Sequence, residues 1–158
     1  MCIDTIWNCD SPEDQSLTSL CTRCCSTIQE ATATSGRELS VMLTTDVHMA
    51  ELNLMWRKKA VPTDVLSFAM DEGELPPGIQ DFEPPLGDIV ISLDTAQRQA
   101  REHQWQLADE ISFLLVHGFC HLLGYDHMNA EDAHRMRSEE TRLLAIIAPG
   151  LQRPPTAY

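Results

Sequence analysis

Residues 117–127 read HGFCHLLGYDH, and their histidines decide how the rest of the chain is interpreted. His117 and His121 stand four positions apart, in a stretch whose apolar residues recur at helical spacing. On a helix such residues lie one above the other with Cβ atoms roughly 5–6 Å apart, which suits two imidazoles on one metal ion. Gly124 is expected to end the helix in a left-handed conformation, so that the chain turns back and brings His127 to the same ion. Three neutral ligands leave a fourth position for water, which is the arrangement of a catalytic zinc site.

The spacing also matches the metzincin protease signature, H-E-x-x-H-x-x-G-x-x-H, except at one position. Gly118 stands where those proteases carry the glutamate that acts as general base. A glycine inside a helix costs about 1 kcal/mol relative to alanine, so we expect that this position must be small. Either close backbone packing or room for a substrate beside the metal would require this. The metal-ligand spacing therefore fits a protease, whereas the proteolytic chemistry does not.

The composition indicates a single domain that does not cross a membrane. The chain has 158 residues, of which 43% are hydrophobic, and no apolar run approaches the roughly 20 residues of a membrane span. Its first residues lack the basic and apolar regions of a signal peptide, so we expect a cytoplasmic protein. Cys21, Cys24 and Cys25 are expected on the apolar face of a helix, as small hydrophobic residues. The alternatives, a second metal site or a redox pair, lack a second Cys-x-x-Cys or a nearby histidine.

The hydrophobic pattern predicts an α+β fold, with a small mixed sheet of about four strands and about five helices. Strands are expected at 3–7, 39–43, 65–68 and 88–92, and helices at 11–32, 45–56, 92–103, 107–123 and 129–147. Ser11 is expected to cap the first helix with Pro12 at its first position. An acidic loop, 71–86, is either a flap over the site or a solvated excursion. Residues 1–148 are expected to form one metal-hydrolase domain with its metal site at the end of a late helix, and 149–158 a disordered tail.

The segment HGFCHLLGYDH resembles the H-G-x-x-H-L-x-G-Y-D-H motif of the YbeY family, bacterial zinc-dependent endoribonucleases linked to ribosomal RNA maturation. Two further segments resemble the same family, PTDVLSF at 62–68 and LGDIVIS at 86–92, and the resemblance covers about residues 38–147. It implies a single-strand-specific endoribonuclease acting in ribosomal RNA processing and ribosome quality control. The implied partners are single-stranded RNA, ribosomal RNA and the ribosome or its small-subunit components. Cys120 departs from the family pattern, and a cysteine beside a zinc ligand could compete for the metal.

The resemblance also assigns roles to individual residues. His117, His121 and His127 would hold one zinc ion, and His117 is thereby part of the catalytic centre. Without the resemblance, Arg57 is expected to be an exposed arginine at a helix end. It matches, however, the family arginine that acts on RNA beside the zinc ion. Its planar fork can hold two oxygens of one phosphate. Hydroxide produced at the zinc would attack phosphorus directly or deprotonate the ribose 2′-hydroxyl, and both routes stay open.

The net charge of −13 is unusual for a protein that acts on RNA. Positive charge is nevertheless concentrated locally, because Lys58 and Lys59 directly follow Arg57. Two other functions remain, a non-catalytic ribosome-assembly factor stabilised by zinc and a metzincin-like peptide hydrolase. The oligomeric state is left open.

The sequence also predicts the positions or roles of several other side chains. Asp126 either orients a histidine or completes a turn. His48, His103 and His134 are expected at the surface, and Trp56 and Trp105 in core or half-buried positions, although either ring could stack on a base.

Overall fold

The computed structural model describes residues 3–58, 63–70 and 83–154. They form a four-stranded mixed sheet with the spatial order β1-β2-β4-β3. Its strands are β1 (Ile3–Asn8), β2 (Leu39–Thr44), β3 (Val65–Ala69) and β4 (Gly87–Ser92). β1, β2 and β4 are parallel, whereas β3 runs antiparallel to β4 and occupies one edge. The predicted small mixed sheet is confirmed.

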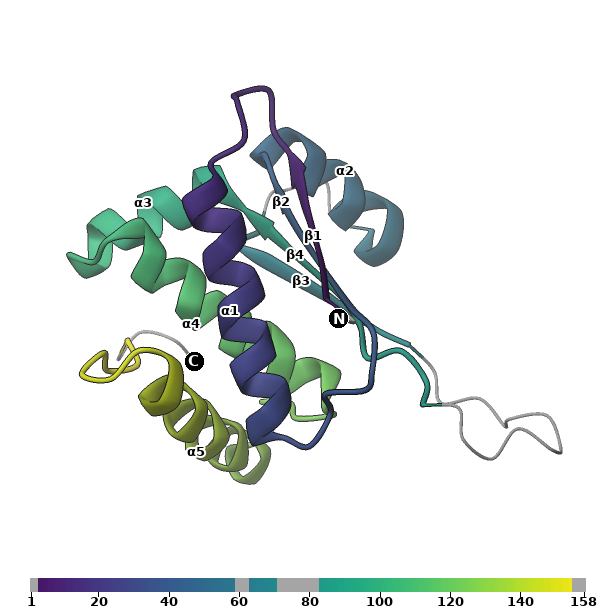
Figure 1. Cartoon of the computed structure of the whole chain (residues 1–158), viewed down its shortest axis with the longest axis vertical. Helices are drawn as coiled ribbons and strands as arrows, with labels where there is room; N and C mark the ends of the chain where they lie inside the picture. The colour runs from purple at the N-terminus through teal and green to yellow at the C-terminus, as the bar shows by residue number, and fades with distance from the viewer. Residues whose placement is uncertain (1–2, 59–62, 71–82, 155–158) are drawn as a thin grey trace, which may run out of the picture.

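Five helices surround this sheet, as the sequence predicts. They are α1 (Gln15–Ala31), α2 (Asp46–Arg57), α3 (Leu93–His103), α4 (Leu107–Leu122) and α5 (Ala130–Ile147). Figure 1 shows α2 on one side of the sheet, and α1, α3, α4 and α5 on the other. Within that second group α4 is central, because it contacts α1, α3 and α5 as well as β3 and β4. The α+β assignment is confirmed, and none of the described helices is long and apolar enough to span a membrane.

The start of α1 differs from the prediction. The N-cap is Asp14, whose Oδ1 accepts hydrogen bonds from the backbone N–H groups of Ser16 at 3.0 Å and Leu17 at 3.3 Å. Ser11, the predicted cap, instead accepts the indole N–H of Trp7 on its carbonyl oxygen at 2.9 Å. Both residues are good caps and lie three positions apart, so the local signal alone does not distinguish them.

The three cysteines of α1 lie in the core, as expected. Cys21, Cys24 and Cys25 are buried and free. Burial raises the pKa of Cys21 to about 12, which keeps its thiol neutral and unreactive. Among the described residues, none of these cysteines belongs to a group placed to hold a metal ion. They therefore act as small apolar residues of the core.

Asp46 joins the start of α2 to α3. The hydroxyl groups of Ser92 and Thr95 each donate to Asp46 Oδ1 at 2.6 Å, and Arg98 forms an ion pair with its other oxygen at 2.9 Å. Burial by itself raises the pKa of Asp46, but these hydrogen bonds and the arginine outweigh that effect and lower it. These contacts anchor the start of α2, the helix whose opposite end carries Arg57.

The C-terminal residues differ in part from the expected disordered tail. Residues 149–154 are described, and Arg153 forms an ion pair with the buried Glu140 of α5 at 2.8 Å. Leu151 packs against the core. Residues 155–158, and 71–82 of the acidic loop, lie outside the described residues.

Candidate metal centre

α4 places His117 and His121 one turn apart, with their Nε2 atoms 3.3 Å from each other. The helix ends at Leu122, and Gly124 adopts the left-handed conformation with φ +96°. The N–H group of Tyr125 then donates to the carbonyl of Cys120 at 3.0 Å, which closes the turn. This turn brings the ring of His127 to 5.4 Å from that of His121, measured between centroids. The structure therefore assembles the three predicted histidines, and their ligand atoms all lie within 4.8 Å of one another.

The spacing of these nitrogens suits a tetrahedral ion. Metal–nitrogen bonds of zinc measure about 2.0–2.1 Å, so two ligand nitrogens of a tetrahedral site lie about 3.3–3.4 Å apart. His117 and His121 meet this separation. His127 is exposed at the mouth of the site, so its side chain can adjust to a shared ion.

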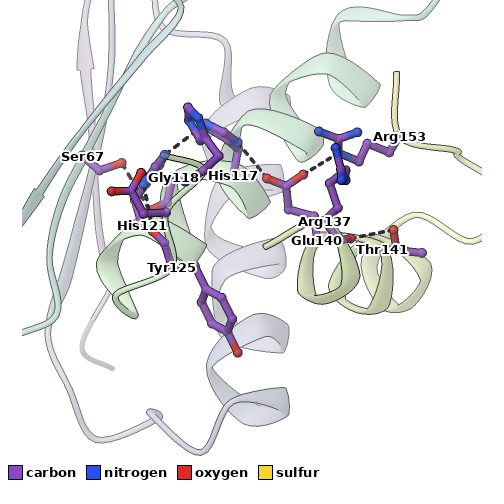
Figure 2. Close-up of polar contacts among 11 residues, drawn as sticks. Ser67, His117, Gly118, His121, Tyr125, Arg137, Glu140, Thr141 and Arg153 are labelled. Atoms are coloured by element: carbon purple, nitrogen blue, oxygen red, sulfur yellow. Dashed lines mark hydrogen bonds and ion pairs between the residues drawn. The ribbon is translucent and has the colours of Figure 1, made fainter. Parts of the chain in front are cut away.

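The other ring nitrogens explain why the two Nε2 atoms point at each other. His117 Nδ1 lies 2.8 Å from Glu140 Oε1, and His121 Nδ1 lies 3.1 Å from the carbonyl oxygen of Tyr125 (Figure 2). Because carboxylate and carbonyl oxygens accept, both Nδ1 atoms donate, and in neutral imidazoles this leaves a lone pair on each Nε2. Two lone pairs that face each other at 3.3 Å repel unless a cation lies between them. The donor set therefore fits a metal ion.

Electrostatics favour the neutral form of His121. Burial lowers the pKa of His121, and the neighbouring His117 and His127 lower it further. Metal ions bind neutral imidazole, so the site is prepared for an ion rather than for a proton.

The three histidines open into a cleft of about 870 Å³ that Arg57 also lines. Arg57 is the last residue of α2, and its Nη2 donates to the carbonyl oxygen of Ser67 on β3 at 3.4 Å. The following residue, Lys58, ends the helix in the left-handed conformation with φ 57°. Lys59 lies outside the described residues. Arg57 thus shares a cleft with residues sixty positions later in the chain, because β3 lies beside β4 at the edge of the sheet that α4 covers.

Gly118 permits α4 to lie directly against the sheet. A Cβ atom at this position would lie 3.0 Å from Ile89 Cγ2 and 3.2 Å from Ser67 Oγ. The Ser67 hydroxyl also donates to the carbonyl oxygen of Gly118 at 3.2 Å (Figure 2). These contacts support close packing as a reason for the small residue. Because Ser67 also lines the cleft, a larger side chain here would be forced between α4 and the sheet beside the site.

Two neighbours of the histidines have defined surroundings. Asp126 accepts the backbone N–H of His127 at 2.7 Å, which supports a role in the turn, and its charge also acts on His121. Cys120 is fully buried, its pKa is raised by burial, and it does not belong to the group of residues that could hold the ion.

Two expectations for other side chains are wrong. His103 is not a free surface residue, because its Nδ1 lies 2.8 Å from the buried carboxylate of Glu110. Trp56, expected in a core or half-buried position, is 64% exposed and rests edge-on against Phe68 at a centroid distance of 5.9 Å. Trp105 is half-buried beside Phe113, as expected.

Glu140 is the residue of this site that the sequence pattern did not reveal. It comes from α5, twenty-three positions after the histidine that it contacts. The only signal is its spacing, since it shares the buried face of α5 with Met136, Leu143 and Leu144. An acidic residue on the buried face of a helix needs a partner in the protein interior. For Glu140, His117 is one such partner.

Comparisons with known proteins show which family the chain resembles. A family model described as Endoribonuclease YbeY matches residues 5–148. The Endoribonuclease YbeY of Heliobacterium modesticaldum is 47% identical over 121 residues, which cover 73% of this chain and 72% of the relative. That of Pelotomaculum thermopropionicum is 43% identical over 135 residues, covering 85% and 88%. The solution structure of TM1509 from Thermotoga maritima shares the fold, with a TM-score of 0.64, 21% identity and coverage of 92% of this chain and 88% of that one. The chain that carries this histidine cluster therefore belongs to the YbeY endoribonuclease family.

Proposed function

We propose that this protein is a zinc-dependent endoribonuclease that cleaves phosphodiester bonds in single-stranded RNA. His117, His121 and His127 would hold the one zinc ion, and His117 and Arg57 would form the catalytic centre. The observation that carries the proposal is the pair of Nε2 atoms 3.3 Å apart, in the cleft that Arg57 also lines. Membership of the YbeY family supports RNA as the substrate.

Zinc is the proposed metal because three imidazole ligands suit it and because hydrolysis needs no redox change. When bound, such an ion supplies Lewis-acid chemistry, polarising a phosphoryl oxygen and making a water molecule more acidic.

Arg57 would position the phosphate and neutralise the charge that develops on it. Its contact with the Ser67 carbonyl, at 3.4 Å, is longer than the usual 2.9–3.0 Å of an N–H···O bond. A contact this long is readily exchanged for a phosphate oxygen, and the planar guanidinium can then bind two oxygens at once. Until a phosphate binds, the carbonyl of Ser67 holds the side chain at the cleft.

The charge distribution favours a flexible, single-stranded substrate. The chain has a net charge of −13, so most of its surface repels an extended duplex. Arg57 and Lys58 provide local positive charge beside the cleft, where a few phosphates can be held. Ribosomal RNA, together with the ribosome or its small subunit, is the partner that we propose within this class. The free cysteines in the described part of the chain are consistent with the reducing conditions of the cytoplasm.

The test begins with metal analysis of the purified protein, followed by incubation with a labelled unstructured RNA with and without chelator. We expect cleavage that requires the metal and that falls about 10²–10³-fold in Arg57→Ala, the range found when one donor to a developing charge is removed. Arg57→Lys, which keeps the charge but not the fork, should retain only part of the activity. Arg23→Ala is the matched control, because Arg23 is an exposed arginine on α1.

Cleavage by Arg57→Ala at the wild-type rate would refute the role of the arginine. Metal binding by the wild-type protein without any cleavage of RNA would favour the non-catalytic assembly factor. Cleavage of unstructured peptides would favour the peptide hydrolase. A substrate with a single 2′-deoxyribose at the cleaved position separates the two chemical routes, since it blocks only attack by the 2′-hydroxyl.

A further inference from the structure

The carboxylate of Glu140 links the metal centre to the C-terminal segment of the chain. Glu140 is completely buried, and its two oxygens have different partners. Oε1 lies 2.8 Å from His117 Nδ1, and Oε2 lies 2.8 Å from Arg153 Nε. Figure 2 shows the carboxylate between these two side chains. The three groups therefore form a continuous chain of charge-assisted hydrogen bonds that ends at a proposed metal ligand.

A tight turn after α5 brings Arg153 back to this carboxylate. Gly150 has φ +90°, a conformation that favours glycine, and it lies three residues after the end of α5 at Ile147. The N–H group of Leu151 donates to the carbonyl of Ala148 at 3.0 Å, and its side chain packs against the core. Pro154 is buried as well, and the Arg153 side chain is only 13% exposed. The segment 149–154 is thus held in place, with its arginine directed inward.

The arginine supplies what a buried carboxylate requires. A charge removed from water is tolerated when an opposite charge and hydrogen bonds replace the lost hydration. With one oxygen held by Arg153 and the other by His117, the carboxylate has a single orientation. The imidazole of His117 is then fixed in turn, with Nδ1 donating to Glu140 and Nε2 directed toward His121.

We propose that segment 149–154 is a positioning element of the metal centre, in which Arg153 orients Glu140 and Glu140 orients His117. The affinity for metal would then depend on an arginine beyond residue 148, where the match to the family model ends. This inference rests on the proposed function, because it assumes that His117 is a metal ligand. Groups that orient a ligand histidine commonly change metal affinity by about 10–100-fold.

The first measurement is the zinc dissociation constant of the full-length protein, obtained by competition with a chromophoric chelator. We expect Glu140→Gln to weaken binding by about 10–100-fold and Arg153→Met by about tenfold. Arg153→Lys, which keeps the charge but changes the geometry, should fall between Arg153→Met and the wild type. The matched control is Arg142→Met, because Arg142 is an exposed arginine that forms an ion pair with Glu139 on the same helix. The control should bind zinc within twofold of the wild type.

The second measurement uses the metal-free protein and needs no activity. Nitrogen-15 NMR of the histidine rings, recorded where they are neutral, should show His117 as the Nδ1–H tautomer in the wild type and in the control. In Arg153→Met and Glu140→Gln the signals should move toward a mixture of both tautomers. A merely structural role of Arg153 would lower the melting temperature without changing the tautomer.

The outcomes separate this inference from the proposed function. Wild-type zinc affinity and an unchanged tautomer in Arg153→Met would overturn the positioning role, even if the wild type binds zinc and cleaves RNA. A wild type that binds no zinc would refute the proposed function, while the tautomer of the metal-free protein still decides whether Arg153 orients His117. If Arg153→Met proves unfolded by circular dichroism, Arg153→Lys carries both measurements.

Discussion

Replacing Gly118 with alanine tests why this position, next to the first histidine of the cluster, has no side chain. Alanine is the better helix former and on that basis alone would stabilise α4 by about 1 kcal/mol. Its methyl group, however, would lie 3.0 Å from Ile89 Cγ2 and 3.2 Å from Ser67 Oγ. Carbon atoms pack best at about 3.5–4.0 Å, so Ile89 or α4 itself would have to move by roughly half an ångström.

The two effects oppose each other, and we expect the packing cost to be the larger because Ile89 is fully buried and has little room to move. Overpacking of this kind costs about 1–3 kcal/mol, so the variant should lose about 1 kcal/mol of unfolding free energy after the gain in helix propensity is subtracted. For a chain of this size, that corresponds to a fall in melting temperature of about 2–4 °C.

Urea unfolding of four proteins measures this cost: the wild type, Gly118→Ala, Ile89→Ala and the double variant. Ile89→Ala removes the Cγ2 atom that alanine at 118 would contact. In that background, Gly118→Ala should be neutral or stabilising by up to about 1 kcal/mol. The coupling energy between the two sites is then about 1–2 kcal/mol. If Gly118→Ala stabilises the protein equally in both backgrounds, close approach of α4 to the sheet is not the reason for the glycine.

Three further predictions concern the metal, acid stability and RNA. Zinc at a hundredfold excess over its dissociation constant should stabilise the wild type by about 2.7 kcal/mol. This corresponds to roughly 5–11 °C in a thermal-shift assay, and the same shift in His117→Ala would refute the ligand assignment. The folded-state pKa of Asp46 is lowered from 3.8, so its carboxylate contributes stability above that pH, and the contribution is lost as the pH falls through the folded-state value. Asp46→Asn should therefore flatten the loss of unfolding free energy on acidification below about pH 5, and an unchanged acid profile would contradict this. Single-stranded RNA should quench tryptophan fluorescence less in Trp56→Phe than in the wild type, since Trp56 is 64% exposed next to Arg57; equal quenching would place the bound bases elsewhere.

The histidine cluster was predictable because its geometry is local. His117 and His121 face the same way on any helix, since four residues span about one turn. Gly124 supports the left-handed turn that follows, and the turn brings in His127. The positions of the strands and most helix ends followed from similar short-range signals. Where two such signals competed within a few residues, as Ser11 and Asp14 did at the start of α1, the local sequence could not choose between them.

The remaining parts of the site depend on which elements meet in space. The sequence suggested Arg57 only through a family resemblance, and its place in the cleft depends on β3 pairing with β4 at the edge of the sheet. Trp56 appeared suited to the core, yet it lies on an exposed part of α2. Glu140 and Arg153 carry no motif, and only the packing of α5 and the turn after it bring them to His117. Spacing along one helix is set by backbone geometry that every sequence shares, whereas contacts between distant segments depend on how the whole core packs, which no short stretch of residues encodes.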